Sequence, residues 1–174
     1  MKLIWYLILL SPIVALGQDN YINLTKASSP GIDHYIQSFN EVDGLNTPVP
    51  DISSFLEKLE ERDSPKRSMK FCKTLFHKTR QQFLRHYSPY ATFGETLNAG
   101  KYNCLTGTAL YALLLDHFGI PYTITETNYH IFLVANTAEG QALFEATDPA
   151  HGFVTGPQQI QERIQQYKSD AGRA

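Results

Sequence analysis

The chain has 174 residues, of which 43% are hydrophobic and 12% aromatic. This length suits one domain with a sizeable core, and the apolar content excludes a chain that stays disordered in solution. The formal net charge is -2 and no block of like charge occurs, so nothing indicates a nucleic-acid partner or binding to an anionic membrane surface.

The first residues have the layout of a secretory signal peptide. Lys2 gives a positive start, an apolar run follows, and Ala15 and Gly17 place small residues three and one positions before a cut ahead of Gln18. The apolar run is shorter than the roughly 20 residues that a membrane-spanning helix needs. We therefore expect residues 1–17 to be a cleaved signal peptide, a secreted or periplasmic mature protein, and no stable membrane insertion.

The next segment, 18–50, is rich in Asn, Ser, Pro and Gly and is expected to be mostly irregular, with one short element around 34–39. Residues 51–174 are expected to form a single domain. Within it, apolar residues at helical spacing predict helices over 51–62, 64–87 and 104–118, and segment 88–102 between them is expected to be loop.

After Gly119 and Pro121 the apolar period changes from helical to alternating. This predicts three short strands, over 122–127, 130–135 and 142–147, and an amphipathic helix then follows over 158–167. Helices first and a small antiparallel sheet afterwards are typical of an α+β fold. The helix over 104–118 is apolar on most sides, so it is expected to be buried in the centre of the domain.

The chain contains two cysteines, Cys72 and Cys104, and for an exported protein two readings are open. They could form one disulfide, or one could be a reactive thiol and the other a buried one. Cys72 falls on the apolar face of a predicted helix, which favours a structural role. Cys104 begins the buried helix, where free backbone N–H groups and the helix dipole favour the reactive thiolate. Gly100 and Gly107 leave room for another chain close to this sulfur.

A nucleophilic thiol needs a base, and His130 is the candidate. His130 begins the second predicted strand and shares a face with Phe132 and Val134. If that face packs on the helix that begins at Cys104, the imidazole can meet the sulfur. The other histidines lie on predicted helices or loops without a matching partner: His34, His77, His86, His117 and His151.

The base in turn needs an orienting acid, and hairpin register favours Glu145. A four-residue turn over 136–139 would pair Ala135 with Gly140 and set His130 opposite Glu145, with Cβ atoms about 5 Å apart. A register shifted by one residue would put the carboxylate on the opposite face. Asp148, beyond the strand, is the alternative acid.

Four segments together resemble the transglutaminase-like family. These are Gly100-Lys101-Tyr102-Asn103-Cys104, Phe118-Gly119-Ile120-Pro121, His130-Ile131-Phe132-Leu133 and Phe144-Glu145-Ala146-Thr147. In that family a Cys opens a buried helix ending in Leu-Gly-Ile-Pro or similar, a His then begins a strand, and an acid follows an aromatic residue. The resemblance covers residues 70–153, and departs from the family where Ile follows the His and where Glu replaces Asp.

The resemblance implies a papain-like core in which the nucleophile helix packs on a small antiparallel sheet. It implies a catalytic triad of Cys104, His130 and Glu145, and an oxyanion hole that uses the backbone N–H of the nucleophile. Asn98 and Asn103 are candidates for a second donor, the alternative being that both are turn-forming.

The expected chemistry is acyl transfer on a protein or peptide, through a thioester that water or an amine resolves. No cofactor or metal is expected, because zinc motifs such as Cys-x-x-Cys and His-Glu-x-x-His are missing from the sequence. Two other readings remain open. The chain could be an inactive transglutaminase-like binding module of a surface or envelope complex, or a small disulfide-bonded structural protein.

Overall fold

The structure is a computed structural model, and it describes residues 31–42, 52–62, 65–127 and 130–170. The predicted signal peptide, 1–17, lies outside the described residues. The elements in chain order are α1 (Ile32–Val42), α2 (Ser53–Glu60), α3 (Met69–Phe83), β1 (His86–Tyr87), α4 (Phe93–Ala99), β2 (Lys101–Tyr102), α5 (Cys104–His117), β3 (Tyr122–Glu126), β4 (Ile131–Thr137), β5 (Gly140–Phe144), β6 (Phe153–Thr155) and α6 (Pro157–Asp170).

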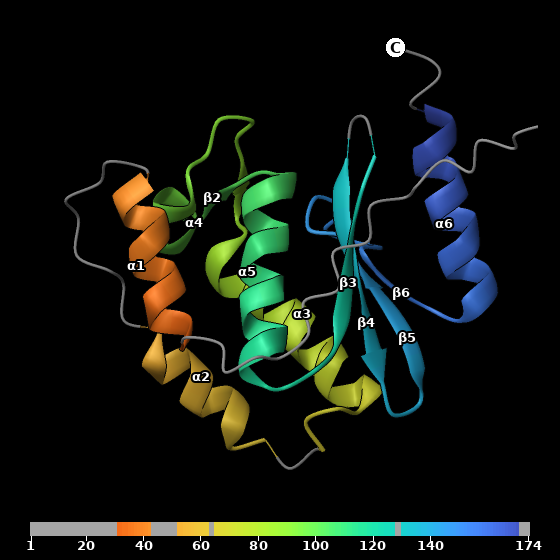
Figure 1. The fold of residues 1–174 in the computed structure, drawn as a ribbon, viewed down its shortest axis with the longest axis horizontal. Helices are drawn as coiled ribbons and strands as arrows, with labels where there is room; N and C mark the ends of the chain where they lie inside the picture. Colours follow the sequence, from red (N-terminus) through yellow and green to blue (C-terminus); the bar gives the residue numbers. More distant parts are fainter. Residues whose placement is uncertain (1–30, 43–51, 63–64, 128–129, 171–174) are drawn as a thin grey trace, which may run out of the picture.

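The described chain has an α+β fold in which an antiparallel sheet lies between helices. The sheet has the strand order β3-β4-β5-β6, and β1 and β2 form a separate parallel pair. Helices α3 and α5 pack on one face of the sheet and α6 covers the other, while α1, α2 and α4 lie on the far side of α5 (Figure 1). The predicted class is therefore confirmed at this level.

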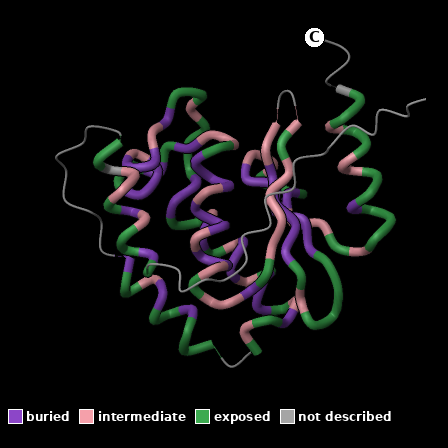
Figure 2. Tube along the Cα trace, viewed as in Figure 1, coloured by how far each residue is buried: buried purple, intermediate pink, exposed green. Residues whose placement is uncertain are grey.

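Helix α5 is the centre of the molecule. Leu110, Tyr111, Leu114 and Leu115 along it have no exposed surface, and buried residues concentrate on α5 and the strands beside it (Figure 2). It begins at Cys104, as predicted, because the Asn103 side chain accepts the backbone N–H of residue 106 in a capping box.

The two faces of the sheet bury different sets of side chains. Leu133, Ala135, Ala142 and Phe144 belong to the large core that includes α3 and α5. Phe132, Val134 and Leu143 instead pack with Ile160 of α6. The expectation that the face bearing Phe132 and Val134 would pack on the Cys104 helix is therefore wrong, because the amphipathic C-terminal helix covers that face.

Two predictions about the first half of the domain need correction. The second helix begins at Met69 rather than at residue 64, because Ser68 caps it by accepting the Phe71 N–H at 3.1 Å. Segment 88–102 is not all loop: it contains α4, capped by Thr92 with Glu95 and closed by Gly100 at φ 71°. With only 7 residues, α4 is too short to give a clear helical period.

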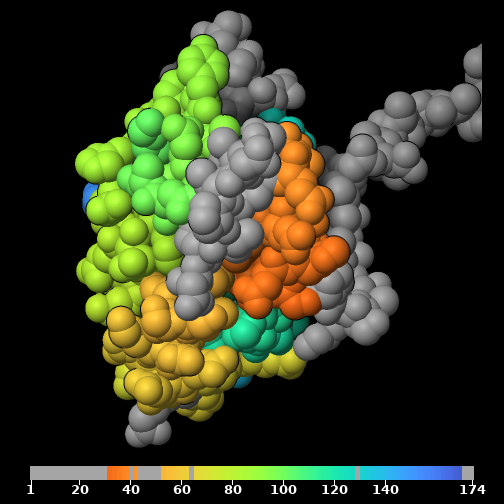
Figure 3. Space-filling view, turned by 90° about the vertical axis from the view of Figure 1, so that its left-hand side faces the viewer, coloured from red at the N-terminus to blue at the C-terminus, as the bar shows by residue number. Residues whose placement is uncertain are grey.

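The segment 18–50 is also more ordered than expected over its described part. Helix α1 extends beyond the short element predicted around 34–39, and its residues Ile32 and Ile36 are buried in the main core. Phe39 stacks on Phe93 of α4, with ring centroids 4.4 Å apart. The folded domain therefore begins before residue 51, and α1 and α2 form much of one outer face (Figure 3).

None of the helices within the four described ranges is both long and apolar enough to cross a bilayer.

Candidate active site

Cys104 lies at the first position of α5 and is partly exposed. Its sulfur accepts hydrogen bonds from the backbone N–H groups of Leu105 and Ile131 and is hydrogen-bonded to the His130 imidazole. The pKa of the thiol is lowered, first by this bond to His130 and also by the charge of the imidazole and the two backbone groups, while burial opposes the shift. The thiolate is therefore favoured at this position.

The other thiol is of the opposite kind. Cys72 lies on α3 with no exposed surface, and burial, with a smaller effect from the charge of Glu139, raises its pKa to about 11. Both thiols are free, so the reading of a Cys72–Cys104 disulfide is not supported. Cys72 fills space in the core, as predicted, and Cys104 is the accessible thiol.

The imidazole of His130 lies between the Cys104 thiol and the Glu145 carboxylate and is hydrogen-bonded to both. Its Nε2 contacts Oε2 of Glu145, which leaves Nδ1 for the hydrogen bond with Cys104. Burial alone would lower the pKa of His130, but the hydrogen bonds and negative charges of Cys104 and Glu145 outweigh it and raise this pKa to about 9. The imidazole is thus held between Cys104 and Glu145, and both neighbours favour its protonated form.

Glu145 is buried, with 1% of its surface exposed, yet both of its oxygens have partners. The backbone N–H and the hydroxyl of Thr147 each donate to Oε1 at 2.7 Å, and Oε2 faces His130. A buried carboxylate that is fully hydrogen-bonded is held in one orientation.

The alternative acid, Asp148, makes its contacts elsewhere. Its Oδ2 accepts from Arg163 Nη1 at 2.9 Å, and its Oδ1 accepts the backbone N–H groups of Ala150 and His151 at 3.2 and 2.8 Å. Of the two acids considered, Glu145 is the one that the fold brings to His130.

The register that led to Glu145 differs from the predicted one. Thr137 pairs with Gly140 around a two-residue turn, and Leu133 pairs with Phe144. The ladder is thus shifted by two residues from the expected pairing of Ala135 with Gly140. A shift of two keeps each side chain on its predicted face, so Glu145 reaches His130 diagonally instead of from the directly opposite position.

Helix α5 is fixed closely against the segment that carries the acid. A Cβ atom on Gly107 would lie 2.5 Å from the Cβ of Ala146, so no larger residue fits there without movement. The room that this glycine was expected to leave for another chain is thus occupied by the chain's own residue beside Glu145. One helical turn from Cys104, the Thr108 hydroxyl donates to the Ile131 carbonyl at 3.2 Å and fastens α5 to the start of β4.

Neither asparagine is placed as a second oxyanion donor. Asn98 Nδ2 donates to the Gly94 carbonyl within α4 at 3.0 Å. Asn103 Nδ2 donates to the carbonyls of Pro89 and Ala91, both at 3.1 Å. Both side chains hydrogen-bond to local backbone, in agreement with the turn-forming alternative. The donors near the sulfur are instead backbone N–H groups, those of Leu105 in α5 and Ile131 in β4.

Sequence reasoning missed Tyr167 of α6 as part of the site. Its ring lies on the imidazole of His130, with centroids 4.7 Å apart, and on Phe132 at 5.2 Å. Burial first, and also a hydrogen bond with Glu145, raise its pKa to about 12, so the hydroxyl stays protonated. The signal in the sequence is that the apolar stripe of the C-terminal helix ends in a tyrosine, whose hydroxyl needs a partner when the ring is buried.

Over the described part of the chain, no group of three or more His, Cys, Asp and Glu side chains is arranged to hold a metal ion. No protein-family model, curated protein or solved structure matches the chain. What the site can do therefore follows from its own geometry: an activated thiol, a basic imidazole and a fixed carboxylate are joined in series.

Proposed function

We propose that this protein is a thiol acyl-transfer enzyme of the transglutaminase-like type, with Cys104 as nucleophile, His130 as base and Glu145 as the orienting acid. Its core would be papain-like, since a central helix begins at the nucleophile and the adjoining sheet carries the base and the acid. The proposal depends on a single observation, the hydrogen-bonded series from the Cys104 sulfur through the His130 imidazole to the Glu145 carboxylate.

In the first half of the reaction, the Cys104 thiolate attacks the carbonyl carbon of an amide or ester. The oxygen that becomes negative would be stabilised by the backbone N–H of Cys104 at the positive end of α5. The bond to the leaving amine or alcohol then breaks, with its proton supplied by the His130 imidazolium, and a thioester on Cys104 remains.

In the second half, water or an amine attacks the thioester carbonyl while neutral His130 takes its proton. The Cys104 sulfur departs as thiolate, and the product is a carboxylic acid or a new amide. Glu145 keeps Nε2 of the imidazole fixed and stabilises its charged form through both halves, as the third member of a triad does.

Labelling of Cys104 by a thiol-directed electrophile tests the proposal. Iodoacetamide at pH 6.5 should modify Cys104 of the wild type at least about tenfold faster than an unactivated thiol, which is mostly protonated at that pH. His130→Ala should lose this advantage, and Cys104→Ala should take up no label. A Cys104 that reacts only as fast as a free cysteine would contradict the enzyme and favour the inactive binding module.

We also propose that the protein acts after export. The support is the signal-peptide layout of residues 1–17, and mass spectrometry of the N-terminal peptide from the native host should find a mature chain that begins at or near Gln18, which can be cyclised to pyroglutamate. Recovery of a chain that still starts at Met1 would overturn this part of the proposal and leave the thiol chemistry unaffected.

A further inference from the structure

Exposed apolar side chains occur in the segments on either side of the proposed nucleophile. Over the described residues the large apolar side chains that stand out in solvent are Tyr87, Tyr90, Leu105 and Val42, exposed by 61, 92, 60 and 84%. The first three belong to the segment that leads into Cys104 or to the residue that follows it, and Val42 ends α1. Clustered exposed apolar groups mark binding surfaces, whereas a single one needs no explanation. Tyr87, Tyr90 and Leu105 are called the apolar patch below.

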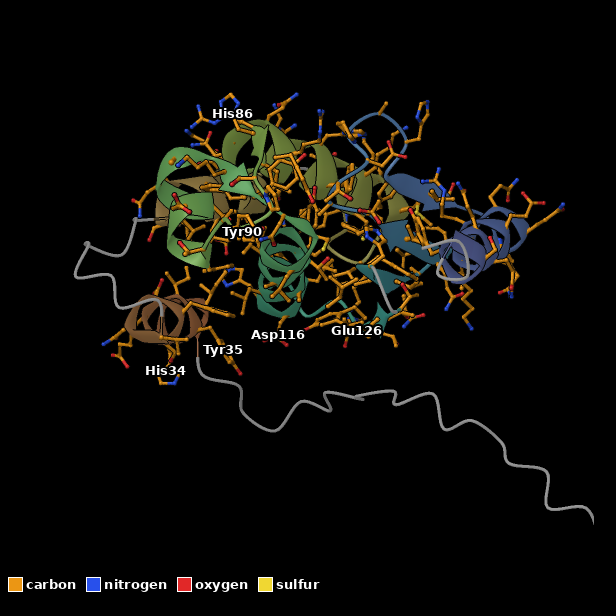
Figure 4. The ribbon with its side chains drawn as sticks, turned by 90° about the horizontal axis from the view of Figure 1, so that it is seen from above. His34, Tyr35, His86, Tyr90, Asp116 and Glu126 are labelled. Atoms are coloured by element: carbon orange, nitrogen blue, oxygen red, sulfur yellow. The ribbon has the colours of Figure 1, made fainter. Side chains whose placement is uncertain are left out.

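The backbone on both sides of Tyr90 is held in place, while the ring itself is exposed to solvent. The Asn103 side chain donates to the carbonyls on both sides of it, those of Pro89 and Ala91, at 3.1 Å each. The same side chain caps α5, so the turn that carries Tyr90 is fastened to the residue next to the nucleophile. Seen from above, Tyr90 lies beside the end-on helix α5 (Figure 4). An aromatic side chain on a fixed backbone offers contact area at a small conformational cost on binding, because it has only two rotatable bonds.

Leu105 and Tyr87 extend this surface on the neighbouring elements. The backbone N–H of Leu105 donates to the Cys104 sulfur, and the exposed Leu105 follows the nucleophile directly along α5. Tyr87, on β1, lies edge-on against Tyr102 at 6.0 Å, and β1 pairs with β2, the strand that runs into the cap of α5. All three members are thus tied to the start of the nucleophile helix.

The charge of this region is also informative. Segment 88–92 contains no charged residue, and Lys101 nearby is paired with Glu95 at 3.0 Å. Two surface hollows of the described chain lie elsewhere, one between α2 and α3 and the other between β6 and α6, and neither is lined by Cys104 or His130. The open turn 88–92 is uncharged, although Arg85 and His86 are exposed beside Tyr87, and such a surface suits a side chain of an extended polypeptide better than a long acyl chain, which needs an enclosed cavity.

We infer that the acyl donor is a polypeptide with an aromatic or large aliphatic side chain next to the reacting carbonyl, and that this side chain binds on the apolar patch. The inference rests on the proposed function, because it assigns a substrate to the same thiol. Burial of the substrate side chain against Tyr90 and Leu105 would bring the carbonyl to the sulfur and exclude water from the thiolate.

The test compares p-nitrophenyl esters of N-acetyl-phenylalanine, N-acetyl-leucine, N-acetyl-aspartate and N-acetyl-glycine. The Cys104 thiolate attacks the ester carbonyl, the C–O bond breaks, p-nitrophenolate leaves with the electron pair, and the thioester forms; water then releases the acid and returns the thiol. The burst of p-nitrophenolate gives the acylation rate. For the wild type we expect the phenylalanine ester to acylate about tenfold faster than the glycine ester, and the aspartate ester to show no such advantage.

The variants are Tyr90→Ser, Leu105→Ser and the double substitution, with Val42→Ser as a matched change of an exposed apolar residue on another element. The ratio of the phenylalanine and glycine rates should fall to about twofold in the double variant and stay near the wild-type value in Val42→Ser. Iodoacetamide labelling in parallel reports the thiol itself. If Cys104 is labelled rapidly but the enzyme shows no preference among the esters, the apolar patch does not bind the substrate. The same conclusion holds if the preference persists in the double variant. Either result would overturn this inference but not the proposed enzyme. A Cys104 inert to iodoacetamide and to every ester would overturn both.

Discussion

Glu145 lies diagonally across the β4–β5 hairpin from His130, and Oε2 of its carboxylate contacts Nε2 of the imidazole. The other carboxylate oxygen is occupied by two donors from Thr147, so the carboxylate cannot turn away. Tyr167 covers the imidazole ring at 4.7 Å. The ring therefore has its second nitrogen directed to Cys104, the orientation that proton transfer from the thiol requires.

The two thiols should respond oppositely to alkylation. Because the pKa of Cys104 is lowered and that of Cys72 is raised to about 11, iodoacetamide at pH 6 to 7 should modify Cys104 alone. Peptide mapping by mass spectrometry gives the site of modification, and Cys104→Ala is the control. Labelling of Cys72 first would contradict the assignment of the reactive thiol.

Acyl transfer should also depend on pH in a definite direction. The imidazolium that protonates the leaving group persists until pH rises through the His130 pKa of about 9, and the thiolate is lost when pH falls below the lowered pKa of Cys104. The acylation rate with an amide substrate should therefore rise from acid to neutral pH, stay level, and fall above about pH 9. A rate that keeps increasing past pH 10 would show that His130 is not the acid for the leaving group.

Glu145→Gln should reduce the reactivity of Cys104 far more than Asp148→Asn does. Loss of the Glu145 charge lowers the His130 pKa, because the imidazolium loses its anionic partner, and the reactive thiolate–imidazolium population at pH 6.5 shrinks. Comparable replacements have cost up to about 10⁴-fold in turnover. Asp148 contacts Arg163 instead of His130, so Asp148→Asn should cost less than about tenfold. The measurement is the rate of Cys104 alkylation as a function of pH, with thermal melting as a check of folding. If Asp148→Asn removed the pH dependence of this rate and Glu145→Gln left it unchanged, Asp148 would be the orienting acid instead of Glu145.

Tyr167 should position His130 mainly through its ring. Tyr167→Ala removes the aromatic contact at 4.7 Å and should slow acylation by about two- to tenfold, since such contacts contribute about 0.5–1.5 kcal/mol. Tyr167→Phe keeps the ring but loses the hydrogen bonds to Glu145 and from Arg163, and should retain most of the rate. The ratio of the acylation rates of the two variants, measured across pH, separates an effect on the position of His130 from an effect on the stability of the fold. Equal losses in both variants would assign the effect to the hydroxyl.

Gly107 should tolerate no side chain. In Gly107→Ala the new methyl group meets Ala146 at 2.5 Å, so α5 and the segment beside Glu145 must separate, at a cost of about 1–3 kcal/mol in the free energy of unfolding. Gly31→Ala is the matched control, because nothing lies within 4 Å of its added Cβ, and it should change stability by less than about 0.5 kcal/mol. Urea unfolding measures both, and two equally stable variants would contradict the close approach.

The local parts of this structure follow from the sequence. The capping residue Asn103 and the apolar run after it determine that a buried helix begins at Cys104. The change to alternating apolar residues after Pro121 predicts β3, β4 and β5, since periodicity is a property of neighbouring residues, whereas the short strands β1, β2 and β6 were not predicted. Strand alternation places His130 and Glu145 on one face in any register that differs from the predicted one by an even number of residues. The prediction therefore survived a register error of two residues and would not have survived an error of one.

The long-range contacts were decided only by the tertiary structure. Whether Phe132 and Val134 face α5 or α6 depends on how the apolar helix α5 and the amphipathic helix α6 divide the two faces of one sheet, and each helix has an apolar face that could cover it. The same holds for Tyr167 on the imidazole and for the Ile131 N–H at the sulfur, which join segments distant in the chain. A sequence encodes which side chains must be buried, whereas their partners are selected by the packing of the whole core, where all the faces compete for the same apolar surface.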